Sequence, residues 1–346
     1  MDFGDLNEKQ KLELRETCKR ILQPAKGIFA TDDTAAGLGP RLEALGKENS
    51  TEERRKYRQL LYSAANLSDH ISAIIMIEEA FRQKNDDNEL FAEVLAKQGI
   101  VTGVQADLGL LPLNAHETHV KGLDGLEERL KAYKEEGAGF VKWRAAINIG
   151  DGRPSREALT KNAAELAQYA KLSQLNGLVP FVEPDVVRDG SHSIEECQKA
   201  TELALEYTFR ALHAANVYLE GTILKPNMVT CGADYSGHPP MPSEVARATL
   251  LALQRHVPSA LPGCVFLSGG QGEIEATKNL NAIAQLQTEK PWHLTFCYGR
   301  AIQGPVMRAW NGKDENIKIA HEVLHHYAKN NGLAQQGEYM YTVLVP

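Results

Sequence analysis

Segments with the periodicity of amphipathic helices alternate with short apolar runs along almost the whole chain of 346 residues. The helical segments repeat apolar residues three and four positions apart, whereas the apolar runs have the length and composition of buried strands. A helical segment precedes the first run, and another follows each run. The runs predicted to be strands are residues 27–32, 71–77, 102–107, 140–144, 178–183, 222–225, 264–268 and 294–299.

Strand–helix units of roughly 25 to 45 residues, repeated about eight times, predict a (β/α)8 TIM barrel of the α/β class. A doubly wound open sheet is the alternative, but no Gly-x-Gly-x-x-Gly turn follows the first strand, which favours the barrel. The sequence has no linker rich in Pro, Gly or Ser and no low-complexity tract. We therefore expect a single domain over residues 1–346, with an N-terminal helix and a short C-terminal tail.

Nearly every predicted strand ends in a charged or hydroxyl-bearing residue. Active sites of such barrels lie at the carboxyl ends of the strands, so these residues are the first candidates for chemistry. Polar residues are ordinary where strands meet solvent, but several of these lie inside apolar runs, which solvent exposure does not explain. The candidates are Asp32, Glu78, Asp107, Lys142, Arg144, Glu183, Asp185, Lys225, Ser268, Tyr298, Gly299 and Arg300.

Side chains two positions apart on a strand point to the same face. Lys142 and Arg144 are therefore expected to point the same way, with Trp143 on the opposite face. Glu183 and Asp185 share a face as well if their strand continues past the intervening proline. Two cations and two acids in one barrel mouth would shift one another's pKa values and supply groups for acid–base catalysis.

Lys225 ends the apolar run "GTILK" and is followed at once by proline. A lysine held at the mouth of a buried strand can lose its hydration and its proton and become a nucleophile. We expect Lys142, lying beside Lys225, to lower the pKa of Lys225 by like-charge repulsion. The alternative is a lysine whose side chain extends into solvent.

Two glycine-containing turns, "LSGGQ" and "YGRAI", follow the seventh and eighth predicted strands. Gly269, Gly270 and Gly299 would let backbone N–H groups approach an anion closely, and Arg300 adds a guanidinium. The loops after these two strands are the common phosphate site of such barrels. A phosphorylated small molecule is thus the expected ligand, and ordinary βα turns are the alternative.

Composition narrows the class of protein. The net charge is −7, which argues against a nucleic-acid partner because phosphate backbones select basic surfaces. Five widely spaced cysteines without a Cys-x-x-Cys pair predict free thiols in a reducing compartment. The opening "MDFGDLNEKQ" is unlike a signal peptide, and no segment is long and apolar enough to span a bilayer. We expect a cytoplasmic protein without a membrane partner.

One motif indicates a different chemistry. The string "HEVLH" at residues 321–325 fits His-Glu-x-x-His, the helical zinc-protease signature, with His321 and His325 on one helix face. Few residues follow it, and Glu338 is the one candidate for a third ligand. The string also belongs to an amphipathic closing helix, where such side chains are usually solvated. Metal hydrolysis is therefore the weaker hypothesis.

Together the motifs resemble those of the class I fructose-bisphosphate aldolases. The resemblance runs from about residue 7 to about residue 340, and its most specific strings are "LEGTILKPNMVT", "GLVPFVEP", "FVKWR", "FLSGGQ" and "LTFCYGRA". It implies a glycolytic or gluconeogenic lyase without a metal or other cofactor. Such a lyase cleaves a ketose phosphate such as fructose 1,6-bisphosphate into dihydroxyacetone phosphate and an aldehyde. It also implies a homo-oligomer, a tetramer by resemblance.

The resemblance assigns catalytic roles. Lys225 matches the lysine whose neutral amine forms the Schiff base. Asp32 matches the acid that handles the proton of the hydroxyl on the bond to be broken, and Glu183 matches the group that forms and dehydrates the carbinolamine. Lys142 matches the cation that supports these steps. Asp185 stands where the family usually has glutamate, which shortens its reach by a methylene.

Substrate binding is assigned in the same way. The loops after strands seven and eight match the site for the phosphate on carbon 1, and two arginines match further basic residues near the substrate. The candidate substrate-binding residues are Ser268, Gly269, Gly270, Gly299, Arg300, Arg41, Arg144 and Thr34.

The departures from the family pattern concentrate around the second phosphate. Thr34 and Gly37 replace two serines, and Gln105 and Leu108 replace two lysines; the lysine normally found at the position of Leu108 lies near the far phosphate. The chain also stops at "YMYTVLVP", short of the usual flexible tail with its terminal tyrosine. From this tail we expect slow protonation of the enamine.

These departures leave alternatives open. A weakened carbon-6 phosphate site would favour a fructose 1-phosphate-like substrate or another aldehyde. A low-activity relative that serves as a scaffold or binding protein is the other alternative. Asp32, Lys142, Glu183 and Lys225 are retained together, which argues against a scaffold because unpaired charges in an apolar mouth are costly.

Overall fold

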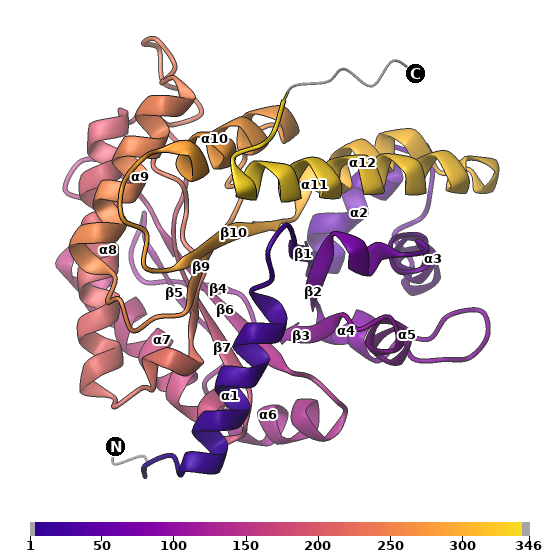
Figure 1. The fold of residues 1–346 in the computed structure, drawn as a ribbon, viewed down its shortest axis with the longest axis horizontal. Coiled ribbons are helices and arrows are strands. Elements are labelled where there is room, and N and C mark those ends of the chain that lie inside the picture. The colour runs from indigo at the N-terminus through magenta and orange to yellow at the C-terminus, as the bar shows by residue number, and fades with distance from the viewer. Residues whose placement is uncertain (1–3, 341–346) are drawn as a thin grey trace.

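The computed structural model describes residues 4–340, which form a closed barrel surrounded by helices (Figure 1). Its parallel strands follow one another around the barrel in the order β1-β10-β9-β8-β7-β6-β3-β2. Their bounds are β1 (Gly27–Thr31), β2 (Ile71–Met76), β3 (Val101–Gln105), β6 (Phe140–Ile147), β7 (Val179–Val186), β8 (Ile223–Leu224), β9 (Gly263–Phe266) and β10 (His293–Tyr298). The predicted (β/α)8 barrel is confirmed, and the alternative of an open sheet is wrong.

Helices cover the outside of the barrel, with α7, α8 and α9 on one side and α3, α4 and α5 on the other (Figure 1). Short 3-10 turns lie at Leu67–Asp69, Leu219–Gly221 and Asp314–Asn316. The helices are α1 (Glu8–Ile21), α2 (Ala35–Glu43), α3 (Thr51–Tyr62), α4 (Glu78–Phe81), α5 (Phe91–Lys97), α6 (Leu126–Glu135), α7 (Arg156–Leu175), α8 (Ile194–Ala214), α9 (Pro242–His256), α10 (Glu273–Gln285), α11 (Arg300–Trp310) and α12 (Ile317–Gln336).

Apolar side chains fill the barrel interior, and α1 packs against the same interior cluster. Phe140 of β6 and Phe181 of β7 stack inside the barrel with their ring centroids 4.4 Å apart. Leu14 and Ile21 of α1 are fully buried in this cluster. Because burial of these apolar groups leaves no room for a ligand inside the barrel, polar chemistry is confined to its ends.

The observed strands depart from the predicted ones in ways that matter for the site. β6 and β7 extend to Ile147 and Val186, so the strand does continue past Pro184. β8 has two residues, although the backbone N–H of Lys225 still donates to the carbonyl of Val182 in β7 at 2.8 Å. The predicted tail beyond residue 340 lies outside the described residues.

A hairpin that the sequence pattern did not predict follows β3. It consists of β4 (Leu110–Pro112) and β5 (Thr118–Val120), which pair antiparallel. Strands of three residues are too short to show a period of two, so the pattern gives no signal for them.

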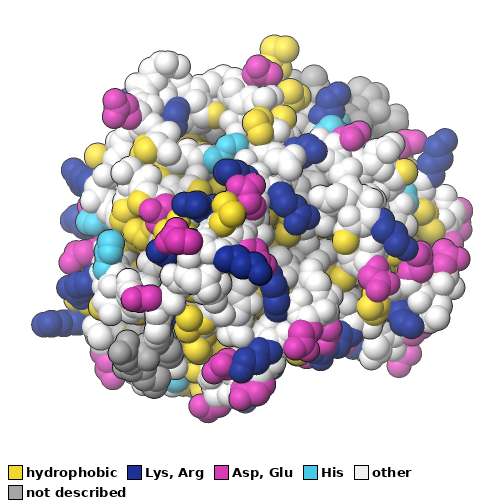
Figure 2. All heavy atoms as spheres, turned by 60° about the horizontal axis from the view of Figure 1, so that its bottom comes forward, with side chains coloured by type: hydrophobic (Ala, Val, Ile, Leu, Met, Phe, Trp, Pro, Cys, Tyr) yellow, Lys and Arg dark blue, Asp and Glu magenta, His cyan; other side chains and the backbone are white. Residues whose placement is uncertain are grey.

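The described helices include none with the length and apolar character needed to cross a membrane. Acidic and basic side chains are intermixed over the face shown in Figure 2.

Candidate active site

Two lysines and two acids form a connected set of charges at the carboxyl end of the barrel. Nζ of Lys142, in β6, lies 2.7 Å from Oδ2 of Asp32, which follows β1, and 3.6 Å from Oε2 of Glu183 in β7. Nζ of Lys225, which follows β8, lies 3.1 Å from Oε1 of Glu183. Glu183 therefore lies between the two lysines.

Burial makes this pairing necessary. Lys142, Glu183 and Lys225 are each at most 4% exposed. An isolated charge in such a place is strongly destabilising, and removal of one partner leaves the other without compensation. The alternation of acid and base therefore holds the set together. The burial of Lys225 also contradicts the alternative in which its side chain extends into solvent.

The pKa of Lys225 is raised, not lowered. Burial alone would lower it, but the carboxylates of Glu183 and Asp32 oppose burial and place the pKa above its usual range. The expectation that Lys142 lowers this pKa is wrong, because Lys142 is itself paired with Asp32 while Lys225 contacts the carboxylate of Glu183 directly. Lys225 is thus an ammonium in the unliganded site.

Asp32 and Lys142 are charged as well. Burial would raise the pKa of Asp32, but Lys142 and Lys225 outweigh it and hold that pKa below its usual range. Burial would lower the pKa of Lys142, but Asp32 and Glu183 outweigh it and raise that pKa. Asp32 is therefore an ionised proton acceptor at neutral pH.

The shared faces predicted for β6 and β7 are confirmed. Nε and Nη2 of Arg144 both lie 2.8 Å from Oδ2 of Asp185, beside the lysine–acid set. Trp143 points the other way, where it is fully buried and stacks on Tyr169 with centroids 5.2 Å apart.

A cavity of about 260 Å³ contains these groups. Its opposite wall is formed by Ser268 and Gly269 after β9 and by Gly299 and Arg300 after β10. Gly269 has a φ of +55°, a left-handed conformation that favours glycine and leaves the backbone open to a ligand. Gly299 immediately precedes α11, and helix amino termini attract anions. One cavity thus brings together two buried lysines, several carboxylates and a glycine-containing wall that carries Arg300.

Comparison with known proteins identifies the family. The family model described as fructose-bisphosphate aldolase class-I matches residues 13–344. The chain belongs to the class I fructose-bisphosphate aldolase family. Members of this family are carbon–carbon lyases of glycolysis that cleave fructose 1,6-bisphosphate through a Schiff base.

Individual aldolases agree with this assignment. Fructose-bisphosphate aldolase 2 of Caenorhabditis elegans is 49% identical over 339 residues, covering 96% of this chain and 92% of the relative. Fructose-bisphosphate aldolase B of Bos taurus is 46% identical over 346 residues, covering 98% and 94%. A crystal structure of the Plasmodium falciparum aldolase, in complex with TRAP and a small-molecule inhibitor, has a TM-score of 0.95 at 41% identity and covers 98% of both chains.

Some residues predicted for the aldolase site lie beside the cavity. Thr34 caps α2, where its hydroxyl accepts from the N–H of Gly37 at 3.1 Å. Arg41 contacts Asp33, with Nη1 and Oδ1 3.4 Å apart, and does not line the cavity. Gly270 is exposed on the same turn as Gly269 and also has a positive φ, +80°.

Two strand-end residues predicted for the mouth point elsewhere. Glu78 begins α4 and pairs with Arg82. Tyr298 is fully buried among the helices, where its hydroxyl donates to the carbonyl of Ala276 at 2.9 Å. The alternation of side chains along β10 explains this, because Cys297 faces the barrel interior and Tyr298 must then face outward.

The sequence interpretation missed two ionisable residues of the cavity wall, Asp33 and Cys297. Burial raises the pKa of the Cys297 thiol to about 12, so it is neutral at pH 7. Asp33 accepts from Nε2 of Gln303 at 2.7 Å and thereby ties the end of β1 to α11. The alternation of side chains along β10 is a sequence signal that could have identified Cys297. The signal for Asp33 is its place directly after Asp32 in "TDD".

The side chains of the zinc-protease string are engaged in packing. Nε2 of His321 lies 2.8 Å from the carbonyl oxygen of Leu60, and the ring of His325 packs edge-on against His70. No group of three or more metal-ligating side chains is found among residues 4–340. His321 and His325 therefore belong to the face of α12 that packs against the rest of the protein.

Proposed function

We propose that the chain reversibly cleaves a ketose phosphate such as fructose 1,6-bisphosphate into dihydroxyacetone phosphate and an aldehyde, through a Schiff base on Lys225. The observation that carries the proposal is the 3.1 Å contact between Nζ of Lys225 and Oε1 of Glu183 inside the cavity. A lysine acts as a nucleophile when a base stands within hydrogen-bond reach and bulk water is kept away.

Glu183 serves the formation of the imine. Its carboxylate accepts a proton from the ammonium of Lys225, and the neutral amine attacks the ketone carbon. The attacking nitrogen then gives up a proton to the former carbonyl oxygen, which yields the neutral carbinolamine. Glu183 then returns its proton to that hydroxyl, which leaves as water, so the carboxylate is restored and the nitrogen becomes a protonated imine.

Asp32 and Lys142 serve the cleavage of the carbon–carbon bond. Asp32 accepts the proton of the hydroxyl on carbon 4 while the bond between carbons 3 and 4 breaks. The electron pair moves toward the protonated imine and forms an enamine, and the aldehyde departs. The ammonium of Lys142, 2.7 Å from Asp32, keeps this acid ionised until it takes the proton.

The glycine-lined wall binds the phosphate on carbon 1. Ser268 supplies a hydroxyl, Gly269 and Gly299 supply approachable backbone, and Arg300 supplies a guanidinium that is exposed in the unliganded structure. Arg144 lies on the side of Asp185 and contributes positive charge there.

Borohydride trapping tests the proposal. Incubation with dihydroxyacetone phosphate and borohydride should yield a stable adduct on Lys225, located by peptide mass. Lys225→Met should abolish both adduct and cleavage, whereas Lys199→Met, on the exposed face of α8, should leave both unchanged. Absence of an adduct from the folded wild-type protein would refute the Schiff-base function.

We further propose a cytoplasmic homo-oligomer, a tetramer, in which residues 1–346 act as one domain. Family membership supports the oligomer, and five cysteines that are all free and buried are in keeping with a reducing compartment. Light scattering of the purified protein should give about four times the chain mass, as expected for a closed symmetric assembly. A monomeric mass at working concentration would count against the tetramer.

A further inference from the structure

Gln303 of α11 connects two walls of the catalytic cavity. Its side chain is buried, and its Nε2 donates to the carbonyl oxygen of Ala30 in β1 at 2.8 Å and to Oδ2 of Asp33 at 2.7 Å. Its Oε1 accepts from the hydroxyl of Tyr57 in α3 at 3.1 Å. Both N–H groups and the carbonyl of this amide therefore have partners, and the complete set of hydrogen bonds fixes its orientation.

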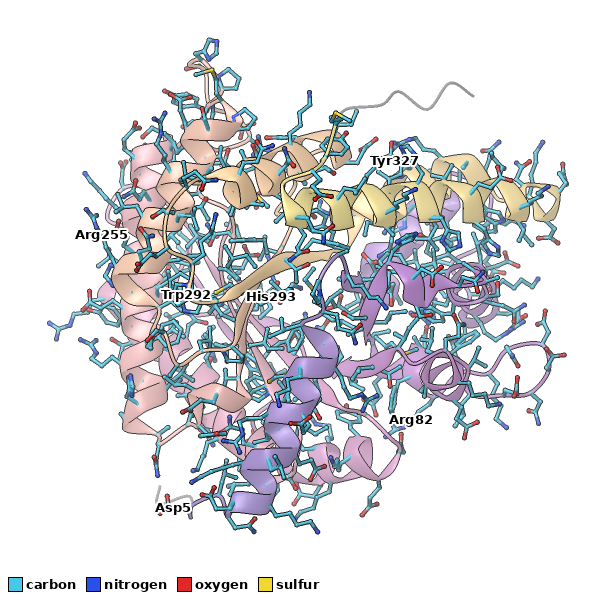
Figure 3. All side chains as sticks on the ribbon, viewed as in Figure 1. Asp5, Arg82, Arg255, Trp292, His293 and Tyr327 are labelled. Carbon is cyan, nitrogen blue, oxygen red and sulfur yellow. The ribbon has the colours of Figure 1, made fainter. Side chains whose placement is uncertain are left out.

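The backbone ladder between β1 and β10 ends just short of the cavity. Its last pair joins Phe29 to Tyr298, and the chain then turns into α11. Figure 3 labels His293, where β10 begins; the strand leads from there to the first turn of α11. Beyond the last pair, the carbonyl of Ala30 accepts from the side chain of Gln303. A side-chain amide thus continues the connection where the sheet stops.

The glycine-lined wall meets β1 at the same point. Gly299 and Arg300 line the cavity at the start of α11, and the backbone N–H of Gln303 donates to the carbonyl of Gly299 at 2.9 Å. A Cβ added to Gly299 would lie 3.2 Å from the carbonyl oxygen of Ala30, closer than most side-chain carbons approach. The first turn of α11 therefore packs directly on the end of β1.

The two aspartates after β1 depend on this connection. Asp32 and Asp33 lie between β1 and α2 and belong to no helix or strand. In contrast, α11 is held in place by Ile302 and Val306, which are fully buried. Because Gln303 bonds both to the last residues of β1 and to Asp33, it transfers the position of a packed helix to this irregular segment.

We propose that Gln303 is a positioning residue that sets the distance between Asp32 and the glycine-lined wall. A substrate anchored on that wall by its carbon-1 phosphate then has its carbon-4 hydroxyl at Asp32. Among the described residues, Gln303 has no hydrogen bond to Lys225 or Glu183, so formation of the imine does not depend on it. The inference rests on the proposed Schiff-base function and adds a residue to its cleavage step.

Gln303→Met tests the inference by separating the two steps. Methionine keeps the length of the side chain but removes its two donors and its acceptor. The kcat for cleavage of fructose 1,6-bisphosphate, per chain able to form the borohydride adduct, should fall about tenfold to a hundredfold, because misplaced groups react slowly. The rate at which dihydroxyacetone phosphate and borohydride modify Lys225 should stay near that of the wild type. An unchanged kcat, or an equal loss of both rates, would overturn the inference.

Gln174→Met is the matched control. Gln174 of α7 is fully buried, and its amide donates to the carbonyl of Tyr218 at 2.7 Å and to the hydroxyl of Thr222 at 3.0 Å. Thr222 lies at the amino end of β8, so this amide is at the end of the barrel opposite the cavity. The control loses comparable hydrogen bonds, yet its kcat per adduct-forming chain should equal the wild-type value. A loss of kcat as large as in Gln303→Met would assign the effect to general loosening and overturn the inference.

Tyr57→Phe is a milder second variant if Gln303→Met does not fold. It removes the hydroxyl that donates to Oε1 of Gln303, while its ring keeps its place against Trp310, with centroids 5.7 Å apart. It should lower kcat by about twofold to tenfold, the value of one hydrogen bond, and leave the rate of adduct formation near that of the wild type. Wild-type kcat in this variant would overturn the inference. Absence of an adduct on Lys225 in the wild-type protein would instead refute the proposed function itself.

Discussion

Arg144 and Asp185 form a contact in which Nε and Nη2 of the arginine both lie 2.8 Å from the same carboxylate oxygen, Oδ2. The other oxygen, Oδ1, is buried and has no hydrogen-bond partner among the described residues. Asp185 is the first cause of the raised pKa of Arg144, which keeps the guanidinium charged. The pair fixes a partly exposed cation at the edge of the catalytic cavity.

This relationship predicts the effect of Asp185→Asn. The amide keeps the size of the side chain but loses the charge that holds Arg144, so we expect kcat/KM for cleavage to fall about tenfold, the value of one lost charge-assisted contact. Steady-state kinetics check this, with Asp189→Asn, an exposed acid in the loop after β7, as the control. Wild-type kinetics for Asp185→Asn would show that the pair does not position the arginine for substrate.

Removal of Lys142 should change the pH profile as well as the rate. Lys142 is the leading favourable partner that keeps the pKa of Asp32 below its usual range, so in Lys142→Met that pKa rises. Because cleavage needs ionised Asp32, the acid limb of the kcat profile should move to higher pH, and kcat should fall about a hundredfold or more. Lys199→Met should show neither effect. A lower kcat with an unmoved acid limb would contradict the assigned link between Lys142 and Asp32.

The sequence was sufficient to predict the barrel and the faces of its longest strands. Lys142, Arg144, Glu183 and Asp185 lie on strands of eight residues, where a period of two is unambiguous. The prediction for Tyr298 is wrong because side chains alternate along β10, and Cys297, one position earlier, already faces the barrel interior. The direction of the pKa shift of Lys225 could not be read from sequence either. It depends on which of several neighbours contacts the amine, and this is decided by side-chain contacts of 2.7 and 3.1 Å between residues of different strands.

The close approach of strands inside the barrel predicts the effect of Gly103→Ala. A Cβ at residue 103 of β3 would lie 2.4 Å from ring atoms of Phe140, which is packed between β3 and Phe181. Such overpacking should lower the free energy of unfolding by about 1–3 kcal/mol. Urea unfolding measures it, and Gly4→Ala is the control because no atom lies within 4 Å of the added group. An unchanged midpoint for Gly103→Ala would mean that the ring can move aside without cost.

Glu79 should make stability depend on acid pH. Its pKa is lowered from 4.5 to about 2, chiefly by its hydrogen bond with Arg54 and further by Arg58, so it links α4 to α3. Because the pKa of Glu79 is lower in the folded state than in the unfolded chain, its charge stabilises the folded state fully at pH values above the unfolded pKa. This stabilisation is lost as the pH falls from 4.5 toward 2. At pH 7, Glu79→Gln should therefore unfold more easily by about 1–2 kcal/mol, allowing for screening of this partly exposed group. The difference from wild type should shrink below pH 4.5, whereas Glu93→Gln, on the exposed face of α5, should match wild type throughout. A difference that stayed constant down to the acid transition would assign the effect of the substitution to packing and not to charge.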